Sequence, residues 1–261
     1  MDIAFWSSFR HRSGVTACVA AMGILWSALY DEEIALTSNH ISNAGLYERL
    51  HGGTERWEKL AGRDYCFQYG EPEYFRQLNG RGVKSEVLLN YGMRYIPMKG
   101  NARTELFCGD GLAGVKRHVG EEHYLMIDTA CGCSRSSQEI MREAKLTVIA
   151  LPPEKEMVDA FFQTETKLLQ NGFFILGNYK ETSTCTPEDL NKVYKIQKER
   201  IGVIPHDFAF EQAMREGTTV SYLAGNLNCS RHSACYPFIR DIRNTARCLR
   251  RYAVKRRDMS A

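Results

Sequence analysis

Short apolar runs rich in β-branched and aromatic residues alternate with longer stretches of helical periodicity along most of the chain. Continuous apolar strands separated by helices are typical of a parallel sheet covered on both faces. The sequence therefore predicts an α/β fold, three layers with a mostly parallel central sheet, in a single domain over residues 1–261. The predicted strands are Ile3–Trp6, Ile34–Thr37, Tyr95–Met98, Tyr124–Asp128, Leu146–Leu151, Phe173–Asn178 and Gly202–Pro205. The predicted helices are Val15–Tyr30, Ser134–Ala144, Lys155–Gln170, Pro187–Glu199 and Phe208–Glu216.

Composition narrows the class of protein further. Hydrophobic residues make up 44% and charged residues 25% of the 261, an ordinary globular balance, and the net charge of +3 does not by itself imply a strong partner. No stretch approaches the roughly 20 apolar residues of a membrane span. The apolar run Val15–Leu29 has no small-residue cleavage site after it, which argues against a signal peptide. Nine irregularly spaced cysteines predict free thiols in a reducing cytoplasm.

The first sixteen residues predict a strand, a tight loop and the start of a helix. Gly14, Val15 and Thr16 occupy the place where a phosphate-binding Walker A loop ends in Gly-Lys-Ser or Gly-Lys-Thr. Such loops need small residues because their backbone N–H groups surround phosphate closely, and the helix N-terminus adds a favourable dipole. The placement indicates a nucleotide site, whereas Val15 lacks the amine that contacts phosphate.

Three later segments also have the pattern of an apolar strand followed by polar or small residues, as expected at the edge of a nucleotide site. Tyr124–Gly132 is an apolar strand that ends in Asp128, Thr129, two small residues and glycine. Phe173–Asn178 is an apolar strand that ends in asparagine. Ile201–Asp207 contains Ile-Pro-His-Asp and precedes a short segment ending at Gly217. With the first loop, and in this order, these segments resemble the ParA/MinD family of deviant-Walker P-loop ATPases, a SIMIBI-type fold that dimerises around nucleotide.

The resemblance implies ATP and Mg²⁺ as cofactors and a set of site residues. The phosphate loop would comprise Arg10, His11, Arg12, Ser13, Gly14, Val15 and Thr16. Magnesium would be held by Thr16 and the Walker B residue Asp128. Switch I would include Ser38 and His40, and switch II would include Thr129, Cys131 and Gly132. The adenine would be bound by Asn178, Pro205 and Asp207.

Several of these positions depart from the family pattern. The family loop Gly-Lys-Gly-Gly-x-Gly-Lys-Thr falls on residues 9–16, where Arg10 and Val15 replace the two lysines. Ser38 and His40 replace the two switch I aspartates. Phosphoryl transfer depends on positioning and charge neutralisation, so we expect weak or no hydrolysis. Two alternatives remain for binding: Arg10 and Arg12 neutralise phosphate through their guanidinium groups, or bulky loop residues fill the pocket.

Two groups of cysteines are candidates for a metal or redox site. Cys131 and Cys133 flank Gly132, but two thiols at this spacing are poorly suited to a disulfide or a complete metal site. Cys229, His232 and Cys235 are three residues apart and could supply zinc ligands. Their pattern lacks a second paired Cys-x-x-Cys, so a metal is not expected. A cysteine-based metal- or redox-responsive binding protein is the remaining alternative of this class.

The C-terminal segment, residues 236–257, predicts a basic amphipathic helix. Its apolar residues recur at helical spacing and are surrounded by arginine and lysine. Three interpretations follow. In the first, the apolar residues form the face that packs the helix on the sheet. Alternatively, the basic end of the helix contacts an anionic membrane, or this basic end binds DNA without sequence specificity. The apolar stripe comprises Phe238, Ile242, Ala246, Leu249 and Ala253.

The family resemblance implies a spatial-organisation or scaffold protein with weak or absent ATPase activity. Pilus-assembly members of the TadZ/CpaE type are the nearest match, which predicts a protein partner from a pilus, secretion or partition system. A homodimer is expected through the surface near Arg10, His40 and Cys131, in the cytoplasm or peripherally at the membrane or cell pole. The alternative is a slow ATP-dependent dimerisation switch in DNA partitioning or division-site placement.

Overall fold

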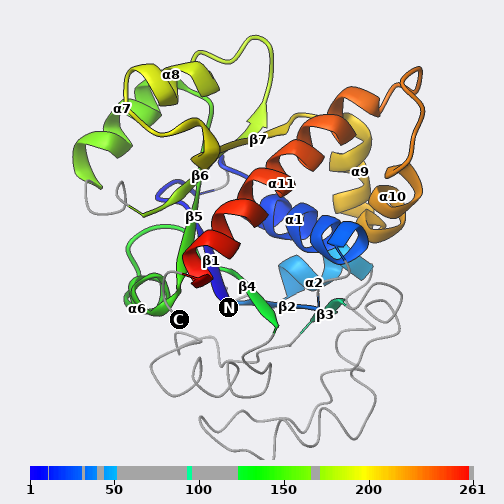
Figure 1. Ribbon diagram of the computed structural model, residues 1–261, viewed down its shortest axis with the longest axis horizontal. Coiled ribbons are helices and arrows are strands. Elements are labelled where there is room, and N and C mark those ends of the chain that lie inside the picture. The colour runs from blue at the N-terminus through cyan, green and yellow to red at the C-terminus, as the bar shows by residue number, and fades with distance from the viewer. Residues whose placement is uncertain are drawn as a thin grey trace, which may run out of the picture.

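The computed structural model describes residues 1–10, 12–30, 33–39, 44–51, 93–95, 123–165 and 171–258. Its centre is a seven-stranded sheet in the order β3-β2-β4-β1-β5-β6-β7, in which every neighbouring pair is parallel (Figure 1). The strands are β1 (Asp2–Trp6), β2 (Ile34–Ser38), β3 (Met93–Tyr95), β4 (Tyr124–Asp128), β5 (Leu146–Leu151), β6 (Phe173–Tyr179) and β7 (Ile201–Pro205).

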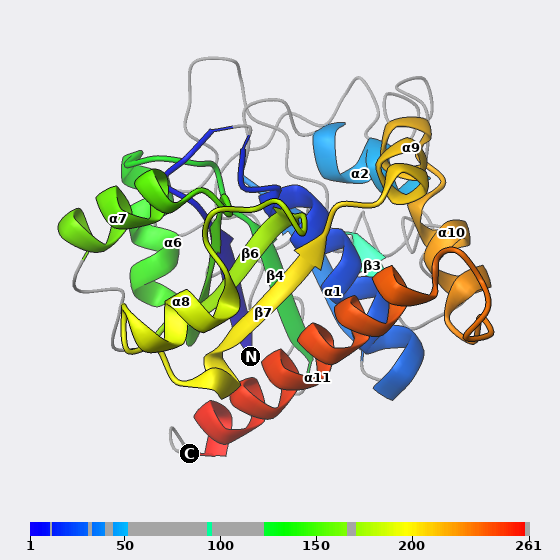
Figure 2. The same ribbon diagram turned by 90° about the horizontal axis from the view of Figure 1, so that it is seen from above.

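Helices cover both faces of this sheet (Figure 2). One face carries α1 and α11, whereas α6, α7 and α8 lie on the opposite side. The helices are α1 (Val15–Tyr30), α2 (Ala44–His51), α6 (Arg135–Glu143), α7 (Lys155–Thr164), α8 (Pro187–Lys192), α9 (Phe208–Glu216), α10 (Thr219–Asn226) and α11 (Tyr236–Asp258). The α/β class with a parallel sheet, predicted from the alternating pattern, is confirmed.

The two-residue period of the strands divides the core into two hydrophobic clusters. Phe5 and Val148 point toward the cluster formed with α1 and α11. Trp6 and Ile149, their chain neighbours, point toward the cluster formed with α7 and α8. All four side chains are buried, because a parallel sheet covered on both faces leaves its central strands no solvent-facing side.

Helix α11 is fastened to the edge strand β7. The Thr245 hydroxyl accepts from the backbone N–H of Val203 and donates to its carbonyl, both at 2.8 Å. The Trp26 indole N–H donates to the Ala246 carbonyl at 3.1 Å and ties α11 to α1. The apolar stripe of α11 is buried in the same cluster as α1. The helix therefore uses its apolar face to cover the sheet.

Several local differences separate the predicted elements from the observed ones. The single helix predicted over Pro187–Glu199 is wrong, because α8 ends at Lys192 and a 3₁₀ turn at Lys198–Arg200 follows. Lys195 has a left-handed φ of 59°, which interrupts helical geometry between the two. Helix α7 ends at Thr164 and not at the predicted Gln170, and neither α2 nor α10 was predicted. Strand β3 lies at Met93–Tyr95, whereas residues 96–98 fall outside the described residues.

No helix within the described ranges combines the length and the apolar character needed to cross a bilayer.

Candidate nucleotide-binding site

The loop between β1 and α1 lies close against strand β6. Gly14 adopts a left-handed φ of 65°, and its carbonyl accepts from the Cys18 N–H at 2.9 Å. An added Cβ at Gly177 would stand 2.0 Å from the Ser13 carbonyl oxygen. Because this separation is far below any real contact, glycine is the residue that lets the loop backbone reach β6. The strand-loop-helix order of a phosphate-binding loop is thus formed by residues 2–30.

Val15 directs its side chain into the core at the start of α1. Only 4% of the residue is exposed, and it belongs to the cluster beneath the sheet face. Arg10 is exposed on the loop, and His11 lies outside the described residues. The loop therefore offers backbone groups and arginine at its rim, without a lysine amine at the helix start.

Thr16 and Asp128 meet at the carboxyl end of the sheet. The Thr16 hydroxyl donates to Asp128 Oδ2 at 2.8 Å, and Asp128 is buried at the end of β4. Ser38, at the end of β2, is the register partner of Asp128 and is also buried. A hydroxyl and a carboxylate are hard oxygen donors of the kind Mg²⁺ prefers, so this pair fits a magnesium ion. His40, the other expected switch I residue, falls outside the described ranges.

The segment after β4 is held to the end of β1. The Thr129 N–H donates to the Phe5 carbonyl, and the Gly132 N–H donates to the Ser7 carbonyl, each at 2.9 Å. The Trp6 indole N–H returns a hydrogen bond to the Gly132 carbonyl at 2.9 Å. Gly132 has φ of 88°, a conformation that favours glycine. These contacts fix the predicted switch II segment beside the loop.

Asn39 links the ends of two strands and was missed in the sequence. Its side-chain oxygen accepts from the Ala130 N–H, and its amide nitrogen lies 3.4 Å from the Ser136 hydroxyl. Its own N–H donates to the Asp128 carbonyl at 3.2 Å, and the residue is only 3% exposed. A polar residue directly after an apolar strand is the signal that could have found it. Asn39 thus connects the predicted switch I and switch II regions.

Cys131 is half-buried next to this junction. Burial raises the pKa of its thiol to about 11, and the Asp128 carboxylate adds to the rise, whereas nearby Arg10 acts in the opposite direction. Burial also raises the pKa of the Cys18 thiol, on α1, to about 12, again with a smaller contribution from Asp128. Both thiols are protonated at neutral pH and are poor nucleophiles or metal ligands there.

A cavity of about 400 Å³ opens beside the loop, between β6, β7, α2 and α9. It contains the three residues predicted to bind adenine, Asn178, Pro205 and Asp207, together with Arg12 and Gly14 from the loop. Its volume lies in the range of small-molecule sites. The sequence did not indicate the rest of its lining, which consists of Ala17, Arg49, Gly177, Ile204, His206, Phe210, Glu211, Met214 and Arg215.

The polar side chains around the cavity form different hydrogen bonds within the protein. Asn178 has a left-handed φ of 55°, and its side-chain oxygen lies 2.9 Å from Nδ1 of His206. Asp207 caps α9 by accepting from the Phe210 N–H at 2.7 Å, and it also accepts from the Tyr222 hydroxyl at 3.0 Å. Burial, followed by the Asp207 carboxylate, raises the pKa of Tyr222. Asp207 thus has a structural role at the cavity edge.

The candidate zinc ligands Cys229, His232 and Cys235 lie between α10 and α11. The Cys235 thiol lies 3.3 Å from the Asn226 side-chain oxygen and within hydrogen-bonding reach of Cys229. Within the described part of the chain, which includes all three candidates, no group of three or more His, Cys, Asp or Glu is placed to hold a metal ion.

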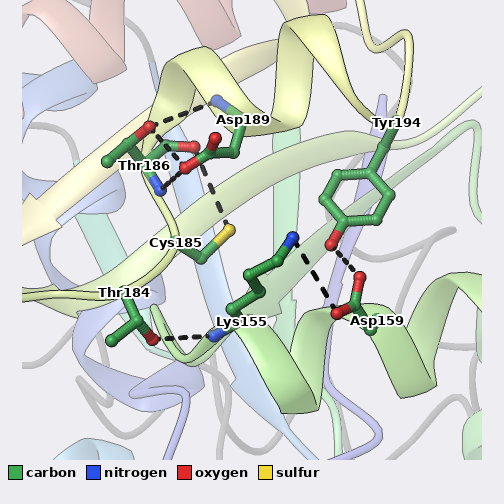
Figure 3. Close-up of polar contacts among 7 residues, drawn as sticks. All are labelled: Lys155, Asp159, Thr184, Cys185, Thr186, Asp189 and Tyr194. Atoms are coloured by element: carbon green, nitrogen blue, oxygen red, sulfur yellow. Dashed lines mark hydrogen bonds and ion pairs between the residues drawn. The ribbon is translucent and has the colours of Figure 1, made fainter.

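A second polar cluster joins the N-terminal half of α7 to the segment from Thr184 to Tyr194, which includes α8 (Figure 3). Thr186 and Asp189 form a reciprocal capping box at the start of α8. Lys155 lies 3.9 Å from Asp159, which also accepts from the Tyr194 hydroxyl. These bonds join the two helices, so the cluster is explained by helix capping and packing.

Comparisons with known proteins support the fold across almost the whole chain. No family model matches, and no curated protein matches in sequence. The cell division ATPase MinD of Pyrococcus furiosus is 13% identical, with a TM-score of 0.66 over 96% of this chain and 98% of its own. The septum site-determining protein MinD of Pyrococcus horikoshii OT3, solved with Mg-ADP, is 14% identical, with a TM-score of 0.64 over 98% and 99%.

A plasmid partition protein of Borrelia burgdorferi B31, solved with AMPPNP, is also similar. It is 14% identical, with a TM-score of 0.61 over 96% of this chain and 98% of its own. The chain therefore has the P-loop fold of the MinD and ParA-type ATPases, which confirms the fold implied by the sequence resemblance.

Proposed function

We infer that the protein is a ParA/MinD-like spatial-organisation protein that binds ATP with Mg²⁺ and hydrolyses it weakly or not at all. The observation that carries this proposal is that the loop between β1 and α1 keeps some features of a nucleotide site and lacks another. Gly14 and the Thr16–Asp128 pair keep the geometry of a phosphate and magnesium site, whereas Val15 is buried at the position of the catalytic lysine. The loop therefore retains residues suited to binding phosphate and magnesium, but it has valine in place of the lysine that assists catalysis.

Each retained residue has an assigned role in this proposal. Thr16 and Asp128 hold Mg²⁺, which neutralises charge on the β- and γ-phosphates when it is bound. Gly14 lets the backbone approach the phosphates, and Asn178 and Pro205 contact the base inside the cavity. Ser38 carries no carboxylate to position an attacking water, which is the second reason to expect slow chemistry.

The cellular role is proposed to be that of a scaffold or positioning factor for a pilus, secretion or partition system. The similar structures include a cell division ATPase and a plasmid partition protein, which supports a role in spatial organisation. A homodimer would use the exposed loop at Arg10 and the segment at Cys131, which lies close enough to Arg10 for the guanidinium to lower the pKa of its thiol. In the alternative, ATP closes this dimer and slow hydrolysis releases it.

Helix α11 supplies a candidate contact surface for a polyanion. Its apolar stripe is buried against the sheet, so it is not available for insertion into a membrane. The residues it exposes are basic or polar over most of its length, which favours non-specific binding to DNA phosphates over lipid insertion. The exposed residues are Pro237, Arg240, Asn244, Arg247, Arg251, Lys255, Arg257 and Asp258.

The enzymatic part of the proposal is tested by phosphate release from ATP and Mg²⁺, with Asp128→Ala as the matched control. We expect the wild-type protein to release no more phosphate than the variant. Rapid release that is abolished in the variant would contradict weak or absent hydrolysis. Slow release above background, abolished in the variant, would favour the slow switch over a scaffold without hydrolysis.

The DNA contact is tested by titrating fluorescent duplex DNA at several salt concentrations. We expect Arg247→Glu with Arg251→Glu to weaken binding and flatten its salt dependence, because two phosphate contacts are lost. Binding to anionic lipid vesicles, with no binding to DNA, would contradict this surface assignment.

A further inference from the structure

Arg49 reaches the cavity from a helix that the sequence signals did not connect with the site. It lies near the C-terminal end of α2, which packs against α9 and α10. Its backbone carbonyl accepts from the hydroxyl of Thr219, a residue with no exposed surface. The backbone at Arg49 is therefore anchored, while the side chain lines the cavity and is exposed to solvent.

The acidic groups of the cavity are already engaged. Asp207 accepts hydrogen bonds from the α9 backbone and from Tyr222, and Glu211 forms an ion pair with Arg215 on the same helix. Among the residues that the structure describes, no carboxylate lies within ion-pair distance of Arg49. Arg49 is thus a cation directed to the cavity without a compensating anion in that described set.

Arg12 adds a second cation at the loop side of the cavity. Its guanidinium lies 3.4 Å from Glu154, but the two side chains are 63% and 54% exposed. Ion pairs this exposed contribute little, so Arg12 can exchange Glu154 for a ligand anion. Of the three arginines in the cavity lining, Arg215 is paired with Glu211 on its own helix, whereas Arg12 is held by an exposed ion pair to Glu154. Arg49 and Arg12 are therefore the two that we consider as ligands for an anion.

We propose that Arg49 is a specificity-determining residue that binds a phosphate group of the nucleotide, so that charge neutralisation comes from arginine in place of the loop lysine. This rests on the proposed nucleotide-binding function. A guanidinium group forms two parallel hydrogen bonds with phosphate and keeps its charge at every physiological pH. Both properties suit a site that has lost its lysine.

The test is calorimetric titration of the full chain with ATP and, separately, with adenosine. Arg49→Ala is expected to weaken ATP binding about tenfold or more, the effect of removing a charge-assisted hydrogen bond, and to leave adenosine binding unchanged. Arg49→Lys should recover part of the loss, because it keeps the charge without the planar fork. Arg142→Ala, an exposed arginine on α6 outside the cavity lining, is the matched control.

The possible outcomes separate this inference from the proposed function. If the wild type binds ATP and Arg49→Ala binds it equally well, the role of Arg49 is refuted and nucleotide binding stands. Equal losses for ATP and adenosine would also refute it, because they would indicate a packing contact with the base. If the wild type binds neither ligand, the nucleotide-binding function itself is refuted.

Discussion

The Thr16 hydroxyl donates a hydrogen bond to the buried Asp128 carboxylate at 2.8 Å, joining the first turn of α1 to the end of β4. In P-loop NTPases a Ser or Thr of the loop and a Walker B Asp hold magnesium, and Thr16 and Asp128 are the residues proposed for these two positions here. Val15, between Gly14 and Thr16, is buried in the core. The pair proposed to bind magnesium is thus in contact, and a buried valine stands where the resemblance implies the lysine that assists phosphoryl transfer.

Gly177→Ala should destabilise the protein and disturb the loop. The new Cβ would lie 2.0 Å from the Ser13 carbonyl, so the loop or β6 must shift. We expect a loss of about 1–3 kcal/mol in the free energy of unfolding, measured with urea, together with weaker ATP binding. Gly225→Ala on α10 is the control, since its Cβ meets nothing within 4 Å and alanine favours helix by up to about 1 kcal/mol. Equal stability of the two variants would be inconsistent with the close packing of the loop on β6.

Asn39→Ala should loosen the segment after β4. It removes the acceptor for the Ala130 N–H, and leaving such a group unpaired costs about 1–3 kcal/mol. Hydrogen exchange should show faster exchange of the Ala130 amide in the variant. Gln138→Ala, an exposed position on α6, should leave that amide unchanged. Unaltered exchange in Asn39→Ala would mean that the asparagine does not hold the two segments together.

Thr245→Val should weaken the attachment of α11 to β7. The hydroxyl satisfies both the N–H and the carbonyl of Val203 on the edge strand, and valine has nearly the same shape without a polar atom. We expect a loss of about 1–3 kcal/mol in the free energy of unfolding, measured by urea titration. Asn244→Ala, at the exposed neighbouring position, should change it little. A stability equal to that of the wild type would argue against this anchor.

Alkylation should distinguish Cys131 from Cys133. Cys133 is exposed, whereas Cys131 is half-buried and its pKa is raised to about 11. Because the thiolate is the reactive form, iodoacetamide at pH 7.5 should modify Cys133 first, and Cys131 should react appreciably only as the pH approaches its pKa. Peptide mass spectrometry over a pH series provides the measurement. Faster modification of Cys131 than of Cys133 near neutral pH would show that its thiol is activated.

The sheet could be predicted from the sequence because its strands are apolar on both faces. Runs such as Leu146–Leu151 are buried throughout, and a two-sided parallel sheet is the structure that accommodates them. Local backbone geometry was harder to predict. The left-handed turn at Lys195 interrupts a segment whose composition suits a helix, and no glycine or proline marks the position.

Motifs in the sequence assigned Thr16, Asp128, Asn178 and Asp207 to the predicted site. In the structure the Thr16 hydroxyl contacts Asp128, and Asn178 and Asp207 line the cavity. The position of Arg49 at the cavity could not be predicted, because Arg49 reaches the cavity only through the packing of α2 against α9. Asn39 stands between two positions assigned by the motif, and its role depends on hydrogen bonds to a distant segment. Contacts that arise from tertiary packing carry no local sequence signature.

Calorimetric titration with ATP and Mg²⁺, of the wild type and of Asp128→Ala, tests the central claim most directly. The account predicts measurable binding by the wild type and a loss of about tenfold or more in the variant, because the carboxylate that holds Mg²⁺ is removed. Thermal stabilisation by ATP should follow the same order. No heat and no thermal stabilisation of the wild type at millimolar ATP would contradict it, and the chain would then be a scaffold that retains the ATPase fold without its nucleotide.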